Sequence, residues 1–218
     1  MSRIVASPLF ADRAAAGQAL AVELGAERGS DVVVVGLARG GVEVAAEIAR
    51  ALGAPLDVVA VRKIGHPFER EYGIGAVTPG DGVYVRASDG LTAERLAVVV
   101  EETKAQAARL DRNLHAEHAP LDLRGRTVLL IDDGLATGAT MVAAVRWAKA
   151  AEAGRVVVGV PVAASASIPL LRREADDVVV LYPLTSFFSV SSWYEAFPPV
   201  HESEVLRLID ANRSHDGR

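Results

Sequence analysis

The fold is decided at residues 128–140, which read VLLIDDGLATGAT. The apolar run at the start predicts a buried strand, and the small residues after the two aspartates predict a tight turn that leads into a helix. Paired carboxylates and a row of backbone N–H donors would then lie at one edge of a sheet. That combination suits a sugar phosphate, because carboxylates accept hydrogen bonds from vicinal hydroxyls while turn amides and a helix N-terminus bind a phosphate dianion.

Short runs rich in β-branched residues recur along the chain, and their nearly continuous apolar character is typical of parallel strands covered on both faces. These runs are Asp31 to Leu37, Leu56 to Val61, Thr127 to Ile131, Arg155 to Val162 and Asp177 to Tyr182. Helical patterns over 42–52 and 141–151 lie between some of them. The alternation predicts an α/β fold, a doubly wound and mainly parallel five-stranded sheet with helices on both faces and a small variable hood.

We expect one domain over residues 1–218, with additions around the central sheet. A helix over 12–26 with Asp12 as its N-cap should precede the first strand. The additions are a lid loop at about 62–82, a candidate hairpin within 78–90, a charged helix at about 92–118, an aromatic-rich hood at about 183–200 and a closing helix at about 203–211.

The composition of the chain narrows the classes of function and of partner that we expect. With 218 residues, half of them hydrophobic, the chain can bury a sizeable core. A net charge of −5 argues against nucleic-acid binding, so small molecules are the expected partners. The sequence has no leader and no apolar run long enough to span a bilayer, which predicts a cytoplasmic protein without a membrane partner. The absence of cysteine excludes disulfides and thiolate metal sites.

The acid pair and its turn resemble the signature with which type I phosphoribosyltransferases bind phosphoribosyl pyrophosphate (PRPP). The order of the motifs extends the resemblance over most of the chain, with LARGG at 37–41, VRK at 61–63 and YEAF at 194–197. This order is similar to a group of predicted phosphoribosyltransferases whose acceptor is unknown. The charged helix and the hood depart from the orotate and purine branches, which leaves the acceptor open.

The resemblance assigns Asp132 and Asp133 to the ribose 2′ and 3′ hydroxyls and the turn after them to the 5′-phosphate. The turn residues are Ala136, Thr137, Gly138, Ala139 and Thr140. Independently of the resemblance, a glycine in the turn permits close backbone approach and the threonines add hydroxyl donors. The alternative is an ordinary turn with an N-capping threonine. The phosphate site is favoured over the ordinary turn, because one pattern contains the strand, the acids, the glycine and the helix that such a site requires.

Two further loops follow strand ends, where ligands bind in doubly wound sheets. After the first strand, the resemblance assigns Ala38, Arg39 and Gly40 to the pyrophosphate, whereas the loop taken alone is an ordinary tight turn. After the second strand, Lys63 or Arg62 would meet the leaving pyrophosphate from a lid that excludes water. An exposed basic loop is the alternative there.

The hood supplies Trp193 and Tyr194 as candidates for stacking on a flat acceptor, and a hydrophobic plug is the favoured alternative for either ring. The sequence does not identify a general base, for which Asp133 and Glu195 are the candidates. A solvated helix end is favoured over a metal site for His115 and His118.

The resemblance implies a Mg²⁺-dependent transferase that moves ribose 5-phosphate from PRPP to a nitrogenous base or similar acceptor and releases pyrophosphate. Asp132, Asp133, Arg39 and Lys63 are its expected catalytic residues, with Mg²⁺ held mainly by PRPP and no dedicated protein cage. A homodimer is expected because relatives commonly dimerise. The alternatives are a PRPP-sensing regulatory protein without transferase activity, or a hydrolase or phosphorylase of phosphoribosyl compounds.

Overall fold

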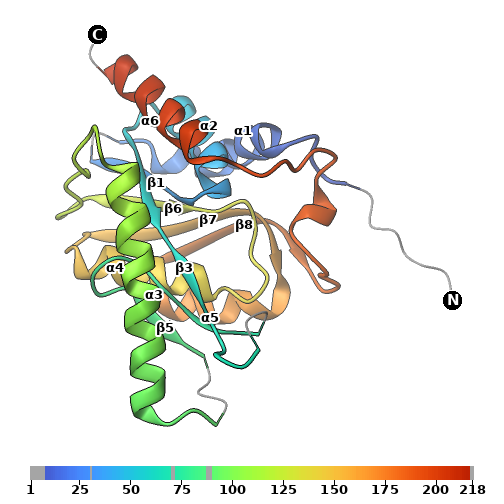
Figure 1. Ribbon diagram of the computed structural model, residues 1–218. Coiled ribbons are helices and arrows are strands. Elements are labelled where there is room, and N and C mark those ends of the chain that lie inside the picture. The colour runs from blue at the N-terminus through green and yellow to red at the C-terminus, as the bar shows by residue number, and fades with distance from the viewer. Residues whose placement is uncertain (1–7, 30, 70–71, 87–89, 217–218) are drawn as a thin grey trace, which may run out of the picture.

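A five-stranded parallel sheet forms the centre of the molecule, with strand order β2-β1-β6-β7-β8 (Figure 1). The computed structural model describes residues 8–29, 31–69, 72–86 and 90–216. The strands are β1 (Val32–Ala38), β2 (Leu56–Ala60), β6 (Thr127–Ile131), β7 (Arg155–Ala164) and β8 (Asp177–Leu184). This architecture confirms the predicted doubly wound α/β fold, and each strand lies where its apolar run predicted it.

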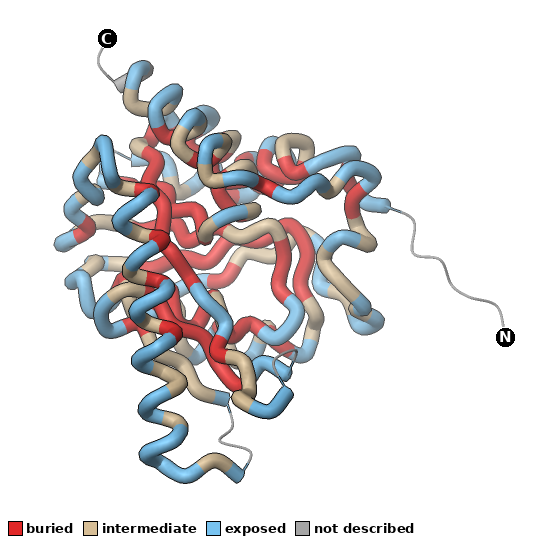
Figure 2. The backbone as a smooth tube through the Cα atoms, in the orientation of Figure 1, coloured by how far each residue is buried: buried red, intermediate tan, exposed pale blue. Residues whose placement is uncertain are grey.

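Helices cover both faces of the sheet (Figure 1). One face carries α1 (Arg13–Glu23), α2 (Gly40–Leu52) and α6 (Glu202–Asp216), and the other carries α4 (Ala139–Ala150) and α5 (Ile168–Glu174). Successive strand side chains point to opposite faces, so Leu129 joins the first core and Leu130 the second. Because both faces are buried, the strands read as continuous apolar runs and show as buried tubes in Figure 2.

The helices begin and end largely where local signals predict. Asp12 caps α1 as expected, since its Oδ1 accepts a hydrogen bond from the Ala15 backbone N–H at 2.8 Å. A short 3₁₀ turn, Leu24–Glu27, follows this helix. Helix α5 was not predicted, because its seven residues are too few to show a helical period.

The segment predicted as a lid loop contains regular structure. Strands β3 (Arg62–Gly65), β4 (Gly73–Val77) and β5 (Val83–Val85) form a separate antiparallel sheet. A hairpin was expected within 78–90, but only its second strand, β5, lies there; the first, β4, comes before residue 78. The sheet forms because Ile64 and Ile74 are buried beneath the long charged helix α3 (Ala93–Leu114). Glycines interrupt the alternation in this stretch, which hides the strands in the sequence.

The hood packs against the N-terminal segment rather than standing free. The backbone N–H groups of Leu9 and Phe10 donate to the carbonyl of Trp193, and Phe10 forms a parallel bridge with Tyr194. This pairing brings the start of α1 beside the hood. Across the described ranges, no helix is both long enough and apolar enough to cross a membrane.

Candidate functional site

Loops from different strands meet at the carboxyl edge of the parallel sheet. The first turn of α2, which follows β1 almost directly, lies against the acid pair that follows β6: a Cβ added at Gly40 would collide with Asp133 Oδ2, and one added at Gly41 would lie 2.6 Å from the Ile131 carbonyl oxygen. Only glycine permits this approach. The peptide bond between Ala38 and Arg39 in the same loop is cis.

The acid pair is half-buried, and the two carboxyl groups influence each other. Asp132 Oδ1 accepts a hydrogen bond from the Asp133 backbone N–H at 2.9 Å. Burial raises the pKa of both carboxyls, and for Asp132 the neighbouring Asp133 charge raises it further. The positive charge of Lys63 offsets part of this rise in the pKa of Asp132. Lys63, one of the predicted site residues, is therefore close enough to act on the acid pair electrostatically. The pair therefore favours ligands that bring positive charge or hydrogen-bond donors.

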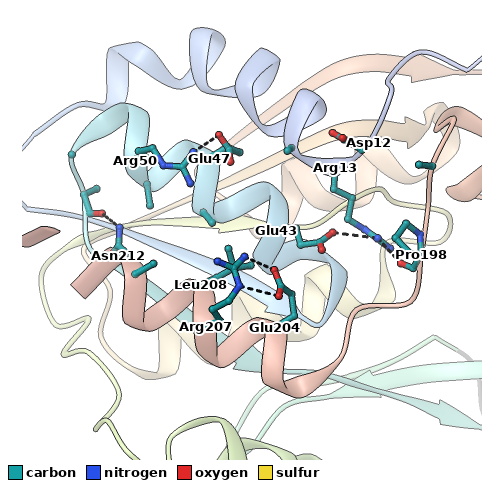
Figure 3. A pocket seen from close by; sticks show the side chains of 17 residues that line it. Asp12, Arg13, Glu43, Glu47, Arg50, Pro198, Glu204, Arg207, Leu208 and Asn212 are labelled. Atoms are coloured by element: carbon teal, nitrogen blue, oxygen red, sulfur yellow. Dashed lines mark hydrogen bonds and ion pairs between the residues drawn. The ribbon is translucent and has the colours of Figure 1, made fainter. Parts of the chain in front are cut away.

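Arg13 is part of the site, although the sequence analysis missed it. Its Nε donates to Asp133 Oδ2 at 2.8 Å. Its Nη1 donates to the Pro198 carbonyl at 2.8 Å, and Figure 3 shows Arg13 beside Pro198. The guanidinium carbon lies 3.6 Å from the centre of the Phe197 ring, and the side chain is 6% exposed. The only sequence signal for this role of Arg13 was its place next to the N-cap of an alanine-rich helix. Its partner Asp133 lies 120 positions away in the sequence.

The turn after the acid pair is anchored at its base and open at its tip. Leu135 donates its N–H to the Val162 carbonyl and accepts from the Ala164 N–H, at 2.9 and 2.8 Å. Gly138 has φ +76° and is the N-cap of α4, while Ala136 and Thr137 are exposed. The turn therefore presents accessible backbone and a threonine side chain immediately before a helix N-terminus, an arrangement that can bind an anion.

The remaining turn residues lie deeper, with Gly138 and Ala139 buried and Thr140 half-buried. At the neighbouring strand ends, Arg39 and Lys63 are both exposed, and no ion pair to either occurs within the part of the chain that the structure describes. Their charges can therefore meet an anionic ligand.

The hood candidates occupy different environments. Tyr194 is 5% exposed, and its hydroxyl donates to the Asp133 backbone carbonyl at 2.6 Å. Its ring lies 5.0 Å from Phe197 between ring centres, and burial raises the pKa of its hydroxyl. Trp193 is half-buried, with an enclosed Nε1 that has no partner in the structure as described, and Glu195 is exposed. Tyr194 thus joins the hood to the backbone of the acid pair.

A cavity of about 760 Å³ lies between α1, α2 and α6, and Arg13 forms part of its wall (Figure 3). Within it, Arg207 contacts Glu204 and Arg50 contacts Glu47, each at 2.6 Å, and Arg13 Nη1 lies 3.4 Å from Glu43 Oε2. Burial raises the pKa of the Glu43 carboxyl. Most charged side chains of this cavity are therefore paired with one another, whereas Asp12 caps α1.

The two histidines of the α3 region link elements away from the acid pair. His115 is 9% exposed at its side chain and contacts Asp57, so the expectation of a solvated helix end is wrong for this residue. His118 Nε2 lies 2.7 Å from Asp210 Oδ1 on α6, and with Glu117 these groups bring atoms of the metal-ligand type within 4.8 Å of one another. This second cluster lies largely at the surface.

Comparison with protein families identifies the chain. A phosphoribosyl transferase domain model matches residues 9–196, which include the loop after β1, the acid pair and Tyr194. The chain belongs to the phosphoribosyl transferase family. The match begins four residues before Arg13 and ends one residue after Glu195, so the family domain contains Leu9, Phe10 and most of the hood.

Individual members of the phosphoribosyl transferase family are similar over nearly the whole chain. "Putative phosphoribosyl transferase Rv0571c" and "Putative phosphoribosyl transferase MT0597", from two Mycobacterium tuberculosis strains, are each 38% identical over 212 residues. Those residues are 95% of this chain but 47% of each relative, so the chain spans about half the length of the curated relatives it matches.

Solved structures share the fold of this phosphoribosyl transferase domain. The crystal structure of TT1426 from Thermus thermophilus is 36% identical with a TM-score of 0.79, and the match covers 92% of this chain and 97% of that one. AQ2163 from Aquifex aeolicus matches with a TM-score of 0.50 at 14% identity, over 78% of this chain and 74% of that chain. The second similarity concerns the fold alone.

Proposed function

We propose that the protein is a Mg²⁺-dependent phosphoribosyltransferase that moves ribose 5-phosphate from PRPP to a nitrogenous acceptor and releases pyrophosphate. One observation carries the proposal: the acid pair, the Arg39–Gly40 loop and the open turn before α4 meet at one sheet edge. Carboxylates for a diol thus lie beside anion-binding backbone, in a chain whose family is established.

Each group has a role that follows from its chemistry. Asp132 and Asp133 would orient the ribose through its hydroxyls, and the turn that contains Thr137 would bind the 5′-phosphate. Arg39 and Lys63 would stabilise negative charge on the departing pyrophosphate. Because the transition state carries positive charge on the ribose, positioning of both partners supplies much of the catalysis.

The acid pair fits a hard divalent cation. Half-buried carboxylates with a raised pKa favour positive charge, and oxygen atoms are the ligands that Mg²⁺ prefers. When bound through PRPP oxygens, Mg²⁺ would neutralise charge on the pyrophosphate. The protein's own contribution is to hold the ribose and to contact the phosphates.

Calorimetry with PRPP and Mg²⁺ tests the proposal. The double variant Asp132→Asn/Asp133→Asn should weaken PRPP binding by roughly tenfold or more, because the hydrogen bonds from the diol lose their charged acceptors. Its circular dichroism should match the wild type. Glu101→Gln/Glu102→Gln, a change of equal charge on the exposed surface of α3, is the matched control and should bind PRPP normally. Unchanged affinity in the aspartate variant would defeat the proposal.

A panel of purine, pyrimidine and pyridine bases, with pyrophosphate release as the measurement, then separates the possible activities. Release that depends on one base class identifies the acceptor. Binding of PRPP without release for any acceptor favours a PRPP-sensing regulator, and release with water alone favours a hydrolase. Light scattering on the same samples tests the proposed homodimer.

A further inference from the structure

The cavity of about 760 Å³ separates two helices that would otherwise pack closely (Figure 3). Residues three and four positions apart lie on one side of a helix, and the lining residues of α2 and α6 follow this spacing. Close packing is the rule in protein interiors, and here the space remains because small side chains lie at the middle of α2. The stripes include Glu43, Ala46 and Arg50 on α2, and Glu204, Leu208 and Ala211 on α6.

The walls of this cavity carry an excess of negative charge. Four carboxylates and three guanidinium groups line it, and one of these guanidiniums, Arg13, is shared with Asp133 of the acid pair. The other two are each bound to a glutamate of the wall at 2.6 Å. Glu43 is left with a weaker partner: its Oε2 lies 3.4 Å from Arg13 Nη1, and its Oε1 has no partner among the described residues.

Glu43 and Arg13 thus each keep an unused polar atom at the same end of the cavity. Burial raises the pKa of Glu43, and the negative charges of Glu204 and Asp133 raise it further, although Arg13 lowers it. A cation bound beside Glu43 would relieve this repulsion. The Arg13 side chain is 6% exposed, and its Nη2 has no partner within the described ranges. A donor in so buried a side chain favours a ligand that brings an acceptor.

An α-amino acid carries both of the groups that this end of the cavity lacks. Its ammonium can donate to Glu43, and its carboxylate, on the same carbon atom, can accept from Arg13. Hydrogen bonds in which both groups are charged are the strong ones. Beyond the two charges, the walls at Ala46, Ala49 and Leu208 are apolar, and the volume is within the range of about 300–1,000 Å³ that is typical of ligand pockets. The cavity therefore suits a large apolar side chain.

We propose that the cavity between α1, α2 and α6 binds a free α-amino acid with a large apolar side chain, with the ammonium at Glu43 and the carboxylate at Arg13. A simple amine or a peptide terminus would present only one of the two charges. This site goes beyond the proposed transferase function and binds its ligand without PRPP. The cavity meets the proposed ribose site at Arg13, whose Nε donates to Asp133.

Phenylalanine and two of its analogues test the pair of contacts. Phenethylamine lacks only the carboxylate of phenylalanine, and 3-phenylpropionate lacks only the ammonium. In calorimetry with the full chain, L-phenylalanine should bind with a dissociation constant below about 1 mM, and each analogue at least about tenfold more weakly, because each loses one charge-assisted hydrogen bond. An analogue that binds as tightly as phenylalanine would overturn the proposal, and so would the absence of phenylalanine binding up to about 10 mM.

Glu43→Gln tests the ammonium contact. This variant should weaken phenylalanine binding by about tenfold or more and leave the affinity for 3-phenylpropionate unchanged, since that analogue has no ammonium. Glu23→Gln makes the same change at an exposed residue of α1 outside the cavity, and it should bind phenylalanine like the wild type. Unchanged phenylalanine affinity in Glu43→Gln would show that the ammonium binds elsewhere, and the proposal would fail.

A variant that fills the cavity tests the location of the site. Ala46→Leu adds methyl groups one helical turn from Glu43, and it should lower the affinity for phenylalanine at least about tenfold while circular dichroism matches the wild type. Ala46 is buried, so should this variant fail to fold, Ala14→Leu replaces it, at a half-buried lining residue of α1. Full affinity in a folded variant of this kind would place the ligand outside the cavity and overturn the proposal.

Discussion

His115 Nε2 lies 3.1 Å from Asp57 Oδ1, and this contact joins the C-terminal end of α3 to strand β2. Asp57 is 2% exposed, and its other oxygen accepts the Leu121 backbone N–H at 2.8 Å. Burial alone would lower the pKa of His115. The hydrogen bonds to Asp111 and Asp57, with their negative charges, outweigh burial and raise it to about 10.

Stability should therefore depend on His115 between about pH 6.5, its unfolded pKa, and about pH 10. In that window the folded protein binds a proton that the unfolded chain has released, so the free energy of unfolding falls with rising pH by up to about 1.4 kcal/mol per unit. The contribution is complete below the window and lost above it. Urea unfolding of wild type and His115→Gln at several pH values should show a difference that shrinks toward pH 10. A constant difference would contradict the raised pKa.

Arg13→Met should lower the free energy of unfolding by about 3 kcal/mol or more, because it leaves Asp133 as a poorly compensated charge in a mostly buried site. Urea denaturation measures the loss. Arg50→Met removes a guanidinium from an ion pair in the same cavity wall, at a side chain that is 61% exposed, and should cost less than about 1 kcal/mol. Equal losses would show that burial does not set the strength of the Arg13 contact.

Gly41→Ala should distort the sheet edge, since the new Cβ would lie 2.6 Å from a backbone oxygen that cannot move alone. We expect a loss of about 1–3 kcal/mol in unfolding free energy, together with weaker PRPP binding. Gly25→Ala is the control, because its Cβ would meet nothing within 4 Å. Differential scanning fluorimetry and calorimetry check both effects, and normal behaviour of Gly41→Ala would contradict the close approach of the two loops.

Tyr194→Phe should cost about 1–2 kcal/mol, because it removes a hydrogen bond of 2.6 Å to a buried site and leaves the Asp133 carbonyl without that donor. Tyr182→Phe, at a residue that is 43% exposed, should be close to neutral. Thermal unfolding of the two variants gives the comparison. A neutral Tyr194→Phe would indicate that water replaces the lost donor.

Much of the central fold could be predicted from the sequence because its determinants are local. Strands β1 and β6 are continuous apolar runs, and the carboxylate of Asp12 marks the start of α1. Parallel strands covered by helices place their carboxyl ends at one edge. That rule was sufficient to predict that Gly40 and the acid pair lie at the same sheet edge, and the structure has them in close contact.

The small antiparallel sheet and helix α5 could not be predicted in the same way. Strand β5 has three residues and α5 has seven. Segments this short do not show a recognisable strand or helix periodicity of hydrophobic residues. The small sheet is stabilised by packing against another element: Ile64 and Ile74 are buried by the apolar side of α3, which lies further along the chain. Tertiary packing outweighed weak local preference.

The sequence by itself determined which chemical groups reach the sheet edge, because strand ends and their loops are encoded within a few neighbouring residues of Asp132. Only the tertiary structure decided how those groups are used. Arg13 and Asp133 meet across 120 positions, and Tyr194 reaches the same residue from the hood. A contact of this kind cannot be recognised from hydrophobic periodicity or from neighbouring residues in the sequence. It forms only when distant elements pack together, because a buried charge is stable only beside a compensating group.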